Sequence, residues 1–232
     1  MVKFVRIASF LIAVVVTVFS IFIIDAEHEL AQARSAFRSG DIDQALRKAR
    51  RANRAFSEDE KKVSAYYLQA RAAAKMNWID KAKDYLDDLL TLDKENVSGL
   101  LFRGEIALQL DQNEDALSDL DKGILLASEN IKPNDLAYYL SKRGLVHLNL
   151  NQINEAATDA RNAINLSDKL PEAHDVMSKV WEELGEIKNA LESCERAYQL
   201  SINKNKLSFM TPEGQELSDR LVDLRVKALR VK

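Results

Sequence analysis

The chain contains very little cysteine, proline and glycine. Its 232 residues include one Cys, three Pro and seven Gly, and aromatic residues make up only 7%. A single cysteine excludes an internal disulfide, and the scarcity of the two residues that disfavour helix interiors predicts a nearly all-helical protein. The formal net charge is −3. The chain therefore lacks the excess of positive charge that is typical of nucleic-acid-binding proteins, and we expect no nucleic-acid partner.

Residues arranged for catalysis or for metal binding are also missing from the sequence. None of the three histidines has a partner at metal-ligand spacing, and no glycine-rich loop suits a phosphate group. Cys194 lies at an apolar position of the pattern described below, and we expect it to be a small buried side chain. We therefore predict a protein that is not an enzyme, with no cofactor, no metal site and no small-molecule substrate.

A pattern of about 34 residues recurs along the chain. One copy is "LNLNQINEAATDARNAINL" (148–166), and similar stretches begin at Phe37, Ala74, Leu108 and Glu182. The ninth residue of every stretch is alanine, and consecutive alanines lie 37, 34, 40 and 34 residues apart: Ala45, Ala82, Ala116, Ala156 and Ala190. A repeat of this length is typical of a solenoid built from pairs of helices.

The fourth residue of each stretch marks a turn. These residues belong to the types that best tolerate a left-handed backbone: Gly40, Asn77, Asp111, Asn151 and Gly185. The pattern predicts that one helix ends there and that a second helix follows a tight turn. The alanine five residues later is small enough for two helices to approach closely.

These positions resemble the tetratricopeptide repeat family over roughly residues 26–200. The family also has a small residue twelve positions before the alanine, which corresponds here to Ala33, Ala70, Gly104, Gly144 and Ser178. The resemblance implies an all-α fold, a right-handed α-solenoid of five helix-turn-helix repeats. The expected repeats are residues 26–59, 63–96, 97–130, 137–170 and 171–204, with extra residues at the junctions "SEDEKK" (57–62) and "NIKPND" (130–135).

Residues 205–232 are expected to form a linker and a C-terminal capping helix. Thr211 and Pro212 suit the start of a helix. Apolar residues then recur at helical spacing, at Leu217, Leu221, Leu224 and Ala228. Such a helix would cover the apolar face of the last repeat, which has no following repeat to cover it.

Residues 1–25 differ from the rest of the chain. The run Ile7–Ile24 has 18 residues without a charge, and as a helix it would span about 27 Å, close to the hydrocarbon thickness of a bilayer. Lys3 and Arg6 precede the run and Asp25 follows it. We expect one N-terminal transmembrane helix with the N-terminus in the cytoplasm and the repeats on the periplasmic or extracytoplasmic side. The alternative is a cleaved signal peptide and a secreted or periplasmic soluble protein.

In the tetratricopeptide repeat family the first helices line a concave groove that binds peptides. The groove positions carried over to this chain include Phe37, Tyr67, Arg71, Leu101, Glu105, Tyr138, Leu145, Leu148 and Lys179. The resemblance implies a scaffold or adaptor that recruits a protein partner, through a peptide or helix segment, close to a membrane. The alternative is a soluble, exported, chaperone-like binder. For Tyr67, Leu101 and Tyr138, packing against the neighbouring repeat is an equally good interpretation.

The first repeat is rich in positive charge. Seven basic residues lie between Arg34 and Arg54, against two acidic ones, Asp41 and Asp43. A solvated helix face is the simpler interpretation, and contact with anionic lipid headgroups is the alternative. The Lys and Asn set with which some family members bind a C-terminal carboxylate is missing, so that activity is not carried over.

Overall fold

The computed structural model describes residues 25–127, 131–204 and 212–230, and every regular element in these ranges is an α-helix. The all-α prediction is confirmed. The chain divides into two compact units, one up to Ile106 and one from Ala107, so that the boundary falls inside helix α5 (Val97–Gln109). Unit 1 contains a helix at residues 25–39, then α2 (Ile42–Ala55), α3 (Asp59–Lys75), α4 (Ile79–Leu92) and most of α5.

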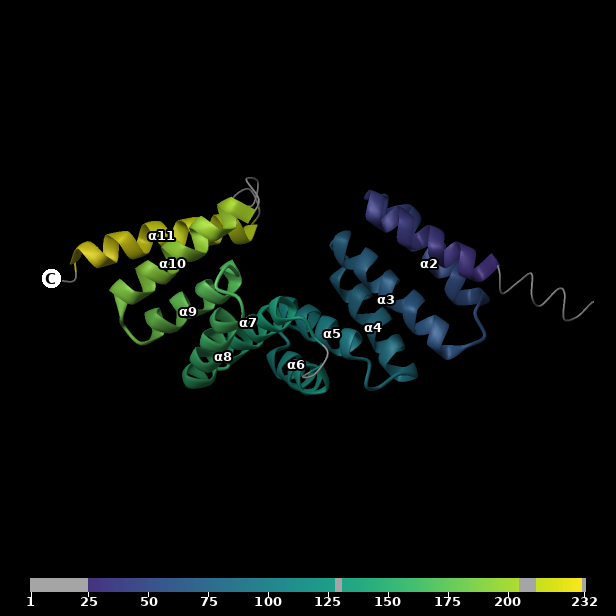
Figure 1. The fold of residues 1–232 in the computed structure, drawn as a ribbon, viewed down its shortest axis with the longest axis horizontal. Helices are drawn as coiled ribbons and strands as arrows, with labels where there is room; N and C mark the ends of the chain where they lie inside the picture. The colour runs from purple at the N-terminus through teal and green to yellow at the C-terminus, as the bar shows by residue number, and fades with distance from the viewer. Residues whose placement is uncertain (1–24, 128–130, 205–211, 231–232) are drawn as a thin grey trace, which may run out of the picture. The chain divides into compact units, whose positions relative to one another are not determined.

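Unit 2 contains the end of α5 and six further helices. They are α6 (Asn113–Ala127), α7 (Pro133–Asn149), α8 (Ile153–Leu166), α9 (Pro171–Glu183), α10 (Ile187–Lys204) and α11 (Pro212–Arg230). Within the unit, α7 packs on α8, α9 packs on α10, and α10 packs on α11. Figure 1 shows these helices in sequence from teal through green to yellow.

All five predicted turn residues have a left-handed backbone. Their φ values are 86° at Gly40, 58° at Asn77, 56° at Asp111, 58° at Asn151 and 75° at Gly185. In the fourth turn, the amide of Asn151 donates to the carbonyl of Leu148 at 2.9 Å and that of Gln152 donates to His147 at 2.8 Å. These bonds satisfy carbonyls at the end of α7, and the reversed chain then starts α8 at Ile153.

The repeat alanines are fully buried in the helical packing. Ala45, Ala82, Ala116, Ala156 and Ala190 are all 0% exposed. Gly144 shows how little space the neighbouring small position leaves. A Cβ atom added there would lie 3.1 Å from a methyl of Val176 and 3.4 Å from the carbonyl oxygen of Ala156. The small residues in the pattern are therefore required by close packing between helices.

The core of unit 1 joins the helix at residues 25–39 to α2 and α3. One cluster contains Leu30 and Ala33 from the first of these helices, Ala49 from α2, and Ala65 and Leu68 from α3. These three helices, drawn in purple and blue, lie next to one another in Figure 1. Burial of such small residues brings the helix backbones close together, and this packing places the first helices of the first two repeats side by side.

The C-terminal helix caps the last repeat, as predicted. Leu217, Leu221 and Leu224 of α11 are 8%, 4% and 0% exposed and pack against Ala190 and Cys194 of α10, among others. Cys194 is buried, in agreement with its expected role. The predicted cap residue Thr211 and residues 205–210 of the linker lie outside the described residues, whereas residues 201–204 continue α10.

Two first helices begin about one turn earlier than the expected repeats. α3 starts at Asp59 rather than at Val63, and α7 starts at Pro133 rather than at Ala137. The extra residues at these junctions extend the helices because they suit a first turn. Asp59 is acidic and forms an ion pair with Lys62 at 3.4 Å, and Pro133 occupies a position that needs no backbone N–H donor.

The predicted transmembrane helix at Ile7–Ile24 lies outside the described residues. Within the ranges that the structure describes, no helix combines the length and the apolar character needed to cross a bilayer.

Candidate functional site

Aromatic side chains of unit 1 meet along its first helices. The guanidinium carbon of Arg71 lies 4.5 Å from the centre of the Phe37 ring and 6.0 Å from that of Tyr67. The ring of Tyr67 meets that of Phe102 edge to face, with centroids 6.0 Å apart. We call Phe37, Arg71, Tyr67 and Phe102 the aromatic row. It links the helix at residues 25–39 with α3 and α5, which are consecutive first helices.

The row combines partly buried rings with an exposed charge. Phe37, Tyr67 and Phe102 are all half-buried, whereas Arg71 is exposed. Burial raises the pKa of the Tyr67 hydroxyl, the nearby Arg71 lowers it, and the carboxylate of Glu105 raises it. Tyr67 is therefore a neutral phenol at physiological pH. The row can offer ring faces, a hydroxyl and a guanidinium to a bound molecule, which are groups common in binding hot spots.

Three of the predicted site residues belong to this row, and Glu105 lies close to it. Leu101 requires a correction, because it is only 2% exposed and cannot contact a partner from the core. Of the two interpretations for Leu101, packing is the right one. Phe102, the next residue along the helix, was not among the predicted site residues. Phe102 lies three residues and Leu101 four residues before Glu105, so spacing on the helix does not choose between them.

The predicted residues of the fourth repeat are part of a packed surface in unit 2. The ring of Tyr138 meets that of Tyr139 at 5.3 Å, and the ammonium of Lys142 lies 5.1 Å from the Tyr138 centroid. Leu145 and Leu148 pack against a core cluster that contains Ala156 and Val176. All three predicted residues are half-buried, so their role in binding stays a prediction.

The predicted residue of the fifth repeat is already engaged within the chain. The Lys179 ammonium lies 3.4 Å from Asp175 and 3.2 Å from Glu216 of α11. Beside it, Arg220 of α11 forms ion pairs with Asp175 and with Glu182, the latter at 2.7 Å, and donates to Ser178 at 3.0 Å. Lys179 is therefore paired with residues of its own chain, including one from α11, and its role in binding stays a prediction.

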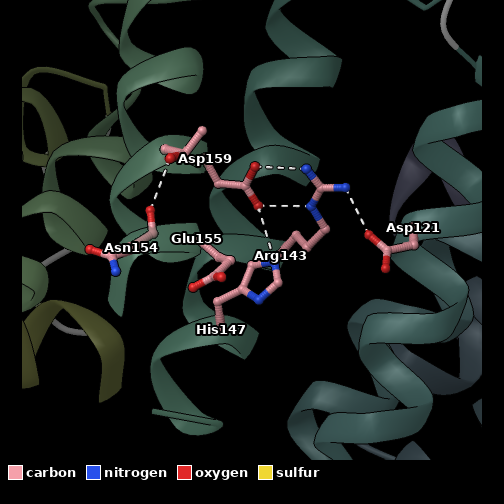
Figure 2. Close-up of a pocket in the computed structure, with 7 residues that line it drawn as sticks. Asp121, Arg143, His147, Asn154, Glu155 and Asp159 are labelled. Atoms are coloured by element: carbon pink, nitrogen blue, oxygen red, sulfur yellow. Dashed lines mark hydrogen bonds and ion pairs between the residues drawn. The ribbon is translucent and has the colours of Figure 1, made fainter. Parts of the chain in front are cut away.

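A polar depression of about 320 Å³ lies elsewhere in unit 2, between α6, α7 and α8. Arg143 lies at its centre. The two bonds from Arg143 to the Asp159 carboxylate are both 2.7 Å long, and a third, to Asp121, is 2.8 Å. Figure 2 shows the guanidinium between the two carboxylates, with His147 beside Asp159. The hydrogen bonds that Arg143 donates to Asp159 raise the pKa of the guanidinium.

This arrangement is better suited to holding helices together than to chemistry. Asp159, whose side chain is only 4% exposed, is neutralised by a bidentate arginine. Unit 1 has a related pair, Arg103 and Asp87, at 2.7 Å. Both arginines lie thirteen residues before a repeat alanine, and Asp87 and Asp121 lie five residues after one. This recurring pair was not predicted, although its spacing is visible in the sequence.

The side chains give no indication of a metal centre. In the described ranges, no group of three or more His, Cys, Asp or Glu residues is placed to hold a metal ion. The aromatic row is the candidate functional site because its rings and its guanidinium lie together, and such groups can bind another molecule.

The comparison with protein families matches the tetratricopeptide repeat at residues 30–77 and 67–130. The first match includes Phe37, Tyr67 and Arg71 of the aromatic row, and the second extends to Phe102 and beyond. No curated protein matches the chain.

Solved structures with the same fold cover most of the chain. MamA from Desulfovibrio magneticus RS-1, starting at its residue 41, is 18% identical with a TM-score of 0.66, and the match covers 78% of this chain and 97% of that one. TTC0263, a thermophilic TPR protein of Thermus thermophilus, is 20% identical with a TM-score of 0.59 and coverage of 87% and 99%. Cut9, in the APC/C hetero-tetramer Cut9–Hcn1, is 18% identical with a TM-score of 0.70, and coverage is 86% of this chain and 36% of that one.

Proposed function

Because the chain is a tetratricopeptide repeat protein, we propose that it is an interaction scaffold whose aromatic row binds a segment of a partner protein. The observation that carries this proposal is the row itself, in which half-buried rings and an exposed guanidinium lie together on three consecutive first helices. Cut9, one of the similar structures, is part of a hetero-tetramer with Hcn1. A binding role rather than catalysis agrees with the groups in the row.

The partner segment would be a peptide or a helix, as these are the elements that helical grooves and faces bind most often. Phe37, Tyr67 and Phe102 would supply apolar contact area, and Arg71 would supply directed hydrogen bonds. Partly buried rings lose little side-chain freedom on binding, which favours affinity. The row is thus suited to a few strong contacts rather than to a large flat interface.

We also propose that this scaffold works at a membrane. The support is the uncharged run Ile7–Ile24, which ends next to the first described helix at residue 25. Anchoring would raise the local concentration of the scaffold near membrane-bound partners, so that modest affinity would suffice. The alternative is a cleaved signal peptide. An alkaline carbonate wash of membranes distinguishes them, because an anchored chain stays in the pellet and a cleaved chain is released.

The test of the binding role is the substitution Tyr67→Ala in the full chain. We expect capture of the partner from cells to fall by about tenfold or more, as for an aromatic hot spot. Helical content by circular dichroism should remain nearly unchanged. The matched control is Trp78→Ala. Trp78 is 39% exposed and also has a cation over its ring, Lys81 at 4.5 Å, but it lies in the turn between α3 and α4, outside the row.

Two results would contradict the proposal. If the Tyr67→Ala and Trp78→Ala variants capture equal amounts of the partner, the row is not the binding site. A large loss of helical signal in Tyr67→Ala alone would show that Tyr67 acts as a core residue. The same pair of measurements applied to Tyr138→Ala examines the packed surface of the fourth repeat.

A further inference from the structure

Four cations lie beside the aromatic row of unit 1. Arg34 and Arg38 belong to the helix at residues 25–39, and Arg71 and Lys75 belong to α3, and all four are exposed. The members of each pair are four residues apart, so each pair lies on one face of its helix. The two pairs are neighbours, because Arg71 stacks on Phe37, which lies between Arg34 and Arg38 on the other helix.

None of these four cations has a carboxylate partner among the described residues. Three of the acidic residues nearby pair with lysines instead, and a fourth, Glu105, lies near Tyr67 at the other end of the row. Glu29 lies 3.3 Å from Lys48, Glu27 lies 2.8 Å from Lys61, and Asp59 lies 3.4 Å from Lys62. Asp41 accepts the backbone N–H of Gln44 at the start of α2. At the Phe37 end of the row, the excess of positive charge is therefore not neutralised by an ion pair among the described residues.

The position of Arg71 prepares it to bind an anion. The guanidinium of Arg71 lies over the rings of Phe37 and Tyr67. The N–H donors at its edge remain available, and they match the two oxygens of a carboxylate. Because the rings already restrict the side chain, binding would cost less conformational freedom than for an arginine in open solvent.

We propose, resting on the proposed function, that the partner segment is acidic and that Arg71 is its main charged contact, assisted by Arg34, Arg38 and Lys75. An acidic peptide fits both features of the site, since its carboxylates pair with the cations and its apolar side chains contact Phe37 and Tyr67. A long polyanion fits less well, because the chain as a whole has a net charge of −3 and would repel uniform negative charge beyond this site.

Fluorescence polarisation with the full chain in detergent micelles tests the inference. The probes are three labelled peptides of twelve residues each. The first repeats the sequence Glu-Leu-Glu-Ala, the second has Gln in place of every Glu, and the third has Lys in place of every Glu. We expect the Glu peptide to bind about tenfold more tightly than the Gln peptide, as one or more charge-assisted hydrogen bonds depend on the carboxylates. The Lys peptide should bind most weakly.

Two variants separate the site from general electrostatic attraction. Arg71→Gln should lose about tenfold in affinity for the Glu peptide. Arg51→Gln makes the same change at an exposed arginine of α2, outside the row, and should retain the affinity. Raising the salt concentration should weaken binding of the Glu peptide and leave binding of the Gln peptide nearly unchanged.

The inference fails if the Glu and Gln peptides bind alike, if neither binds, or if Arg71→Gln and Arg51→Gln lose the same amount. It also fails if Arg71 is required for binding phosphatidylglycerol vesicles or a single-stranded oligonucleotide but not for the Glu peptide. Failure of the proposed function itself is seen separately, as unchanged partner capture by Tyr67→Ala. If Tyr67→Ala loses capture and the peptides bind alike, the row binds a partner that is not acidic.

Discussion

The second and fifth repeats place a cation at the same repeat position and use it differently. Arg71 and Lys179 both lie eleven residues before their repeat alanines, Ala82 and Ala190. Arg71 stacks on two rings and has no carboxylate partner among the described residues, whereas Lys179 lies within 3.4 Å of both Asp175 and Glu216. A basic residue at this position is therefore not in itself a binding residue. The elements that pack beside it decide its role.

In unit 2, that element is α11. Its apolar side covers α10, and Arg220 on the same helix neutralises Asp175 and Glu182 of α9. A capping helix thus buries the apolar surface of the last repeat and also satisfies its charges. In unit 1 the corresponding surface of α3 presents Tyr67 and Arg71, and Arg71 forms no ion pair among the described residues. The comparison indicates which first-helix surface is available to a partner.

The largest effect is expected from Arg220→Ala. The side chains of Arg220, Asp175 and Glu182 are 19%, 25% and 22% exposed. Removal of the arginine therefore leaves two poorly solvated carboxylates without their shared partner, although Asp175 keeps Lys179 at 3.4 Å. We expect unit 2 to lose about 2–4 kcal/mol of unfolding free energy. The control is Arg225→Ala, which removes an ion pair with Glu195. Because the Arg225 side chain is 58% exposed, this substitution should lower the unfolding free energy by less than about 1 kcal/mol. Urea unfolding followed by circular dichroism measures both, and similar losses would show that α11 is not held by this network.

The next effect concerns a feature that both units share. Ala45→Leu in unit 1 and Ala190→Leu in unit 2 each force a larger side chain into a site with 0% exposure. Each should destabilise its unit by about 1–3 kcal/mol. Ala31→Leu, at an exposed position of a helix, is the control and should have little effect. An unaltered melting curve for Ala45→Leu or Ala190→Leu would contradict the close approach of helices at these positions.

The turns should respond less strongly. Asn77 in unit 1 and Asn151 in unit 2 both have φ of 58°, a conformation that costs an ordinary L-residue about 1–2 kcal/mol. Asn77→Ala and Asn151→Ala should each lower the unfolding free energy by about 1 kcal/mol, whereas Asn→Gly at either position should leave it nearly unchanged. Thermal unfolding of the four variants measures this. Equal stability of the Ala and Gly variants would exclude a left-handed turn.

The smallest effect on stability involves Cys194 beneath α11. Burial raises the pKa of this thiol, while Arg220 lowers it and Asp175 raises it. A raised pKa in the folded state adds stability that is present below the unfolded-state value of about 8.5 and is lost as the pH rises through the folded-state pKa, because the unfolded chain releases its proton first. Alkaline loss of stability should therefore be slightly smaller in Cys194→Ala.

Thiol labelling checks the same burial independently. At pH 8, modification of Cys194 in the native chain should be at least about tenfold slower than in urea. Arg220→Ala should speed it, since loosening α11 exposes the thiol. Fast labelling of the native chain would contradict the packing of α11 on α10.

The features predicted correctly from the sequence are those set by local conformation or by repetition. Gly40, Asn77 and Asn151 were placed correctly in turns because a left-handed backbone restricts the residue type at that point alone. The burial of the repeat alanines followed from their recurrence at the same position in every copy. These properties depend on short stretches of sequence, and the pattern that shows them recurs in five copies along the chain.

The features missed depend on contacts between distant residues or on a single residue of helix phase. Lys179 was expected to be available because nothing in its own repeat shows that Glu216 will lie 3.2 Å away. Leu101 and Phe102 are adjacent in sequence and about 100° apart around a helix, so a pattern with Glu105 fits either of them. Only the packing of α5 shows that Leu101 is buried and that Phe102 meets Tyr67.

The most direct test is photo-crosslinking in cells from two positions of the full chain, with a photoreactive phenylalanine analogue at Tyr67 or at Lys179. The account predicts a crosslinked protein partner from Tyr67, in the aromatic row, and none from Lys179, which α11 covers. A partner captured from Lys179 but not from Tyr67 would contradict it.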